Sequence, residues 1–115
     1  MTGNLKYNRL AERPDIKLWL QDDDGAYINF ATPAHTFTWK IGENGVAASF
    51  TKSTGITGGV AAGVEPTGTP NVTLTFTSGE LANVPVGTHG WELTATTSGL
   101  DRKFKGRIVI EDSIL

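Results

Sequence analysis

The stretch of chain from Asn71 to Ala95 constrains the fold most, because apolar and polar residues alternate through two runs within it. Each run places large apolar side chains on one side of an extended chain: Val72, Leu74 and Phe76 in the first, and Trp91, Leu93 and Ala95 in the second. Threonines fill most of the opposite positions, and a short polar piece containing Pro85 and Gly87 joins the runs. The segment therefore predicts two β-strands on either side of a one-turn corner.

Other parts of the chain show the same period of two. Residues 15–20, 35–41 and 102–111 alternate most clearly. Weaker strands are expected at residues 27–30, at 47–54 and at the start of the glycine-rich stretch 55–70. In the first strand Ile16, Leu18 and Leu20 are expected to face inward and Trp19 outward.

Turn signals separate these segments, and helical patterns are missing. Asp-Gly at 24–25, Asn-Gly at 44–45 and Ser-Gly at 98–99 supply residues that tolerate the positive φ of tight hairpins. No stretch longer than one turn repeats apolar residues at helical spacing. We therefore predict an all-β protein, an immunoglobulin-like β-sandwich of about seven strands, with a small closed barrel as the structural alternative.

The 115 residues fit one domain with two appendages. The sandwich is expected over residues 15–111, preceded by an N-terminal arm, 1–14, and followed by a C-terminal tail, 112–115. Apolar residues in both appendages, together with the outward tryptophan, are expected to pack against neighbouring subunits: Leu5, Tyr7, Leu10, Trp19, Ile114 and Leu115.

Composition excludes several kinds of site and partner. The chain has no cysteine, so disulfides, thiolate metal sites and thiol nucleophiles are excluded. A formal net charge of −2 gives no general attraction to nucleic acid or to an anionic membrane, and no segment reaches the length of about 18 apolar residues that a membrane span needs. We therefore predict neither nucleic acid nor membrane as a partner.

Each short motif of the sequence also has a simpler structural interpretation. The acidic run Asp22–Gly25 can be a calcium loop or a hairpin turn, and the Asp-Gly pair favours the turn. His35 and His89 lack the local spacing of a metal site, although either could serve as the base of a small hydrolase. Asn71-Val72-Thr73 matches a glycosylation acceptor string but also suits a strand start. We predict no catalytic, cofactor or metal site.

The last strand carries a stripe of cations on its outer face. Lys103, Lys105 and Arg107 alternate there and could hold phosphate or an acidic partner. Charged residues on an edge strand also prevent sheets from pairing with one another, and this second interpretation is favoured.

The chain resembles the small immunoglobulin-like structural proteins of tailed bacteriophages, in particular the N-terminal domain of the baseplate upper protein family. The resemblance lies in DIKLWLQDDDGAYINF, HTFTWKIG, VTLTFTSGELANVP, GTHGWELTAT and GRIVIED, and it covers nearly the whole chain. The family often has Tyr after Gly-Thr in the corner, where this chain has His89.

The resemblance implies a non-enzymatic virion component, made in the bacterial cytoplasm and present in several symmetric copies. Its implied position is a minor tail, tail-tip or baseplate protein that packs against other phage structural proteins and copies of itself. A capsid decoration protein is one alternative. Another is a module that binds a host-surface glycan through Trp19 and the loop 55–70.

Overall fold

The structure is a computed structural model that describes residues 4–8, 15–42, 50–65, 67–77, 80–81 and 84–111. All regular elements in these ranges are strands. There are eight: β1 (Asn4–Asn8), β2 (Ile16–Leu18), β3 (Thr36–Ile41), β4 (Phe50–Lys52), β5 (Ile56–Gly58), β6 (Val72–Leu74), β7 (Gly87–Thr97) and β8 (Leu100–Glu111). The all-β prediction is therefore confirmed at the level of class.

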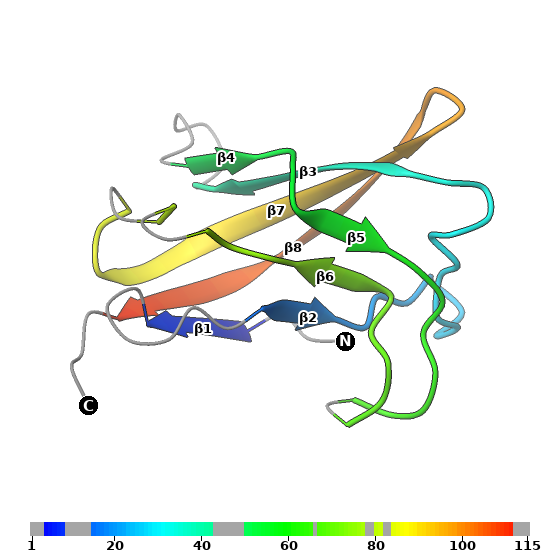
Figure 1. The fold of residues 1–115 in the computed structure, drawn as a ribbon, viewed down its shortest axis with the longest axis horizontal. Coiled ribbons are helices and arrows are strands. Elements are labelled where there is room, and N and C mark those ends of the chain that lie inside the picture. Colours follow the sequence, from blue (N-terminus) through cyan, green and yellow to red (C-terminus); the bar gives the residue numbers. More distant parts are fainter. Residues whose placement is uncertain are drawn as a thin grey trace.

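The strands form two sheets (Figure 1). One sheet has five strands in the order β1-β8-β7-β3-β4, and the other has three in the order β2-β6-β5. The chain passes between the sheets at the connections β1 to β2, β2 to β3, β4 to β5 and β6 to β7. All strand pairs are antiparallel except β1 and β8, which run parallel with Leu5 opposite Ile108.

The core lies between the sheets and consists of the inward side chains that the alternation predicted. Phe37, Trp39 and Ile41 on β3 are buried, and Trp91, Leu93 and Ala95 lie opposite them on β7. Val72 and Leu74 contribute from the smaller sheet, and Phe76 continues their face beyond β6. Phe76 packs edge-on against Trp39 with ring centroids 5.8 Å apart, so aromatic contacts join the two layers.

Residues 4–8 differ from the predicted arm because they form β1, an edge strand of the larger sheet. Tyr7 is buried, and its ring meets Phe76 edge-on at 5.0 Å. Leu5 is half-buried and packs against the core. Strand pairing and core burial within the chain therefore hold this segment.

The outward placement of Trp19 is wrong, because this side chain is only 3% exposed. The strand ends at Leu18, so the alternation of faces no longer applies to the next residues. Leu18, Trp19 and Leu20 are all buried in succession. The expected return strand at 27–30 is also not formed: Tyr27 makes an isolated bridge with Gln21 instead.

Candidate interaction surface

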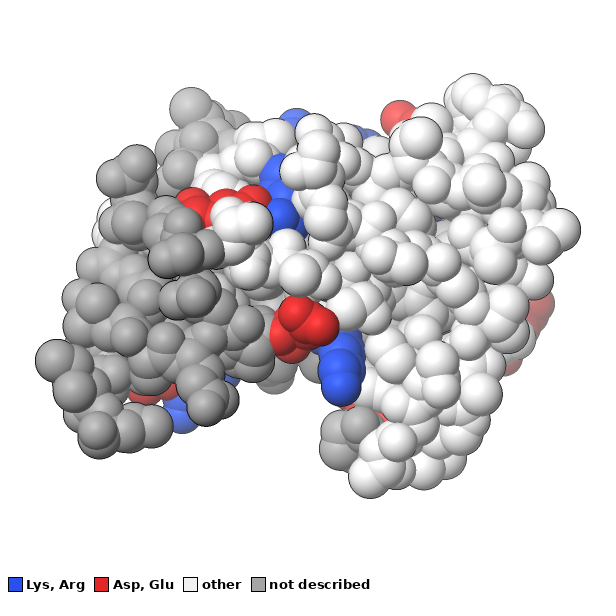
Figure 2. Space-filling view, in the orientation of Figure 1, with Lys and Arg blue, Asp and Glu red and all other residues white. Residues whose placement is uncertain are grey.

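The outer face of the five-stranded sheet carries most of the charged side chains of the described strands. Register places them in rows, with Lys40 beside Glu92 and Glu92 beside Lys105. We define the outer face by the side chains that point away from the core on β1, β3, β7 and β8: Lys6, Thr36, Thr38, Lys40, Thr88, Glu92, Thr94, Thr96, Asp101, Lys103, Lys105, Arg107, Val109 and Glu111. By contrast, most described atoms on the side of the smaller sheet belong to uncharged residues (Figure 2).

Charges on the outer face engage one another. Glu92 forms ion pairs with two lysines: Nζ of Lys103 lies 3.4 Å from Oε1, and Nζ of Lys105 lies 3.7 Å from Oε2. Asp101 accepts a hydrogen bond of 2.7 Å from the Thr96 hydroxyl. The cationic stripe of β8 lies on the exposed face, as predicted, but two of its members share a carboxylate. This arrangement is a solvated network of charges of both signs. It does not gather the positive charges as a phosphate-binding site would.

The first part of β8 forms an edge of the sheet. The strand β1 pairs only with Arg107–Glu111, and among the described residues no strand lies beside Leu100–Phe104 on the side away from β7. We call Leu100–Phe104 the open edge. Inward-facing positions along β8 become progressively more exposed toward the hairpin tip, from Ile108 through Phe104 to Leu100, which is 71% exposed. The tip, orange in Figure 1, stands clear of the other strands.

None of the predicted interface residues that the structure describes is exposed on this surface. Trp19 and Tyr7 are buried within the chain, and Leu5, on β1, is half-buried against the core. Leu10, Ile114 and Leu115 lie outside the described residues. Exposed Leu100, at the tip of the β7–β8 hairpin, was not among the predicted residues. The adjacent Ser-Gly turn was the only sequence signal that marked this position.

Both histidines are bound to nearby carbonyl groups. Nδ1 of His35 lies 2.8 Å from the Pro33 carbonyl oxygen, and Nε2 of His89 lies 2.7 Å from the Pro85 carbonyl oxygen. Since a carbonyl oxygen only accepts, each of these ring nitrogens carries the proton and donates. His35 also packs edge-on against Phe30 at 5.1 Å. These contacts give the two imidazoles structural roles in turns.

The bond of His89 closes the corner between β6 and β7. We expect His89→Phe to lower the free energy of unfolding by about 1 kcal/mol, because it keeps a ring but loses the donor. His89→Tyr supplies a hydroxyl at the end of the ring and is expected to recover most of that loss. Urea unfolding followed by tryptophan fluorescence measures both variants, and equal stability of Phe and Tyr at this position would contradict a hydrogen-bonding role.

Asn71 joins Leu20 and Ile28, the two buried residues on either side of the exposed turn that follows β2. Its side chain is fully buried; Nδ2 donates to the carbonyl oxygens of Leu20 at 2.8 Å and Ile28 at 3.0 Å, and Oδ1 accepts from the Leu20 amide at 2.8 Å. A side chain used and buried in this way is inaccessible to a glycosyltransferase in the folded protein. Asn71 in the acceptor string 71–73 therefore has a structural role. The alternation of the sequence predicted the start of a strand there, but not these hydrogen bonds.

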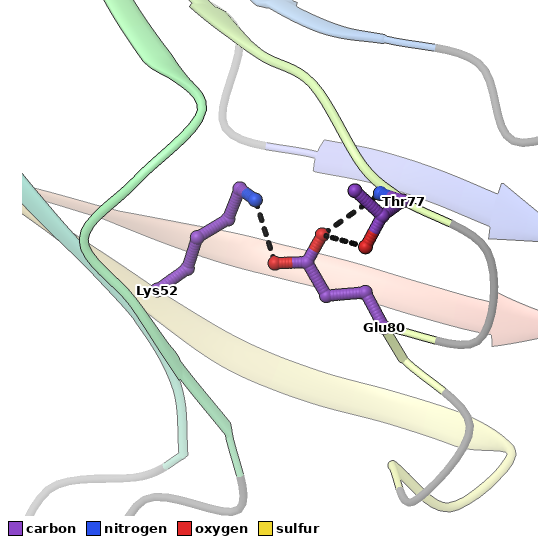
Figure 3. A network of polar contacts seen from close by, with 3 residues as sticks. All are labelled: Lys52, Thr77 and Glu80. Atoms are coloured by element: carbon purple, nitrogen blue, oxygen red, sulfur yellow. Dashed lines mark hydrogen bonds and ion pairs between the residues drawn. The ribbon is translucent and has the colours of Figure 1, made fainter.

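A polar network joins β4 to the corner after β6 (Figure 3). Lys52 has a side chain only 3% exposed, and its Nζ donates to Oε2 of Glu80 at 2.6 Å. The same Nζ lies 5.0 Å from the centroid of the Phe76 ring. Oε1 of Glu80 accepts from the Thr77 amide at 2.9 Å and from the Thr77 hydroxyl at 3.4 Å. The buried ammonium thus has a carboxylate and an aromatic face as neighbours.

These contacts set the ionisation of Glu80. Burial by itself would raise the pKa of this carboxyl, but hydrogen bonds from Lys52 and the Thr77 amide and the charge of Lys52 outweigh burial and hold the pKa below 4.5. The group is therefore a carboxylate at neutral pH, and the network is an ion pair.

The acidic run at Asp22–Gly25 is a turn, as favoured by the Asp-Gly pair. Oδ1 of Asp22 accepts from the amides of Asp24 at 2.9 Å and Ala26 at 3.1 Å, and Gly25 has a φ of 83°. Over the ranges that the structure describes, no three His, Cys, Asp or Glu side chains gather as a metal site would require. Nor do those ranges contain a helix of the length and apolarity that crosses a bilayer.

Comparison with known proteins adds no relative. The chain matches no protein-family model, no curated protein and no solved structure.

Proposed function

We propose that this chain is an immunoglobulin-like packing module of a tailed-phage particle, placed in the tail, tail tip or baseplate. Its partners in this proposal are other structural proteins of the particle and further copies of itself. The observation that carries the proposal is the strand order. It supports the immunoglobulin-like topology that the sequence resemblance implies.

The strand order supports an immunoglobulin-like topology. The sheet β2-β6-β5 corresponds to strands B, E and D of that fold, and β3-β7-β8 corresponds to strands C, F and G, with β4 added beside C. Trp39 is buried on the strand that corresponds to C, where such domains place a core tryptophan. His89 bonds back to Pro85 at the start of the strand that corresponds to F, the place of the tyrosine corner.

The surface supports a role in packing. An exposed apolar residue at a projecting hairpin, Leu100, adjoins a stretch of strand edge without a partner among the described residues. Beside it lies an outer face of threonines and paired charges, which is compatible with the polar rim of a protein interface. Trp19, which would have stacked on a sugar, is buried, so we do not propose glycan binding.

Immunogold electron microscopy tests the proposal on assembled particles. An antibody raised against the purified chain is applied to phage particles produced by the strain that carries its gene, with particles from a deletion strain as control. We expect gold on tails or tail tips. Gold on heads would replace the tail position by capsid decoration, and unlabelled particles in a lysate that contains the chain would overturn the proposal.

A further inference from the structure

We propose that the open edge of β8, Leu100–Phe104, pairs with the same edge of a second copy of this chain. The two strands would run antiparallel about a two-fold axis at Arg102, so that the five-stranded sheets of both copies join into one. This inference rests on the proposed function, since it names one of the partners of the packing module.

The hairpin turn determines which backbone groups of this edge point outward. Ser98 and Gly99 both have positive φ, 50° and 78°, as a two-residue type I′ turn requires. Such a turn directs the Leu100 amide toward the Thr97 carbonyl, that is, toward β7. Alternation along an antiparallel pair then directs the backbone groups of Asp101 and Lys103 away from β7.

The same alternation continues into the part of β8 that pairs with β1. Residues of β8 that bond β1 must direct their backbone groups away from β7, and Arg107 lies opposite Asn4 at the start of that pairing. Arg107 follows Asp101 by an even number of residues, so the two point their backbone groups to the same side. The open edge therefore continues the line of the edge that β1 already uses.

The side chains of the open edge are self-complementary about Arg102. An antiparallel pair centred there places Asp101 opposite Lys103 of the other copy, twice, with both side chains on the outer face. On the inner face it places Leu100 opposite Phe104, and so covers the exposed leucine. The two Arg102 side chains face each other at the axis, where both are exposed and reach solvent.

Neighbouring registers fit less well. Every one of these registers brings one like-charged pair to the axis: two Arg102 guanidinium groups in the first, and two Asp101 carboxylates or two Lys103 ammonium groups in the neighbouring ones. The register centred on Asp101 forms no pair of opposite charges. The register centred on Lys103 pairs Asp101 with Lys105, but it leaves Leu100 opposite Gly106, without an apolar partner. The Asp101–Lys103 pairs therefore favour a second copy as the partner, and the contact of Leu100 with Phe104 selects the register centred on Arg102.

Sedimentation equilibrium of the purified chain tests the pairing. We expect a monomer–dimer equilibrium with a Kd of roughly 10⁻⁵ to 10⁻³ M, because one short strand pair buries less than a standard interface. Asp101→Lys creates two like-charge pairs and is expected to weaken dimerisation about tenfold or more. The exchange variant Asp101→Lys with Lys103→Asp restores opposite charges only in the register centred on Arg102, and is expected to return to within about threefold of the original Kd.

Asp23→Lys is the matched control, because it makes the same change of charge in the exposed turn after β2. It should leave the Kd unchanged, and circular dichroism confirms that each variant is folded. A monomer throughout the range from roughly 10 µM to 1 mM overturns the pairing. Failure of the exchange variant to recover overturns it as well, as does equal weakening by Asp23→Lys. None of these results bears on the gold labelling of particles, which tests the proposed function separately.

Discussion

Asn71→Ala is expected to lower the free energy of unfolding by about 3–5 kcal/mol, a large part of the total stability of a domain of this size. The substitution removes both ends of a buried amide and leaves the Leu20 amide and the Ile28 carbonyl without this partner, while the Leu20 carbonyl keeps only its bond from the Ile28 amide. These groups lie beneath the chain that follows β2, where Leu20 and Ile28 are buried. Each unsatisfied group costs about 1–3 kcal/mol, and local relaxation recovers part of the sum.

Two further variants make this prediction specific. Asn71→Asp keeps the acceptor for the Leu20 amide but turns an oxygen toward two carbonyls, so it should destabilise at least as much as Ala. Asn29→Ala is the matched control, since Asn29 is exposed and its Oδ1 accepts from the Ala31 and Thr32 amides, which water can satisfy. We expect it to cost about 1 kcal/mol or less in urea unfolding. Similar losses for Asn29 and Asn71 would show that the buried network contributes little.

Sequence alone predicted the strands that have one face buried in the core and the other face toward solvent. In β3 and in residues 91–96 of β7 every inward position is apolar and every outward position is polar, so the period of two predicted both the strands and their buried faces. The Ser-Gly turn at 98–99 was equally clear, because a two-residue loop needs residues that accept positive φ.

Prediction failed where burial depends on contacts far along the chain. The segment Asn4–Asn8 is too short to show a period, and its stability comes from parallel pairing with β8, about a hundred residues away in sequence. Trp19 was assigned to the outer face by extending the period of β2 beyond Leu18, where the strand ends. Local patterns contain neither the position of the strand end nor the partner of β1.

The polar groups of the core were missed for a related reason. Lys52 shares a face with Phe50, so its inward direction follows from alternation, but a lysine in that position suggests an exposed strand. Only the fold brings Glu80 to it from the corner after β6. Asn71 likewise gains its role from the Leu20 amide and the Ile28 carbonyl, which it binds. In both cases the role of the residue depends on polar partners that only the folded chain brings close to it.

Glu80→Gln is expected to destabilise the protein by about 3 kcal/mol at neutral pH, because it leaves the Lys52 ammonium buried without a counter-charge. Lys52→Met should cost less, since Glu80 is 19% exposed and can be hydrated once its partner is gone. In the double variant no buried charge remains, so we expect stability within about 1 kcal/mol of the original protein. That result would mean that the ion pair fixes the position of β4 relative to the corner after β6 but adds little net stability.

The dependence on pH separates this ion pair from a simple packing effect. Because the pKa of Glu80 is lowered in the folded protein, its stabilising contribution is fully present above 4.5 and is lost as the pH falls through the lower folded value. The difference in unfolding free energy between the original protein and Glu80→Gln should therefore shrink as urea titrations are repeated at progressively lower pH. Glu65→Gln, in the exposed loop after β5, is expected to leave stability unchanged at neutral pH. This difference in unfolding free energy could instead stay constant down to the lowest pH at which the protein folds. Shape and hydrogen bonding at the corner would then account for the loss, and the charge interaction with Lys52 would not.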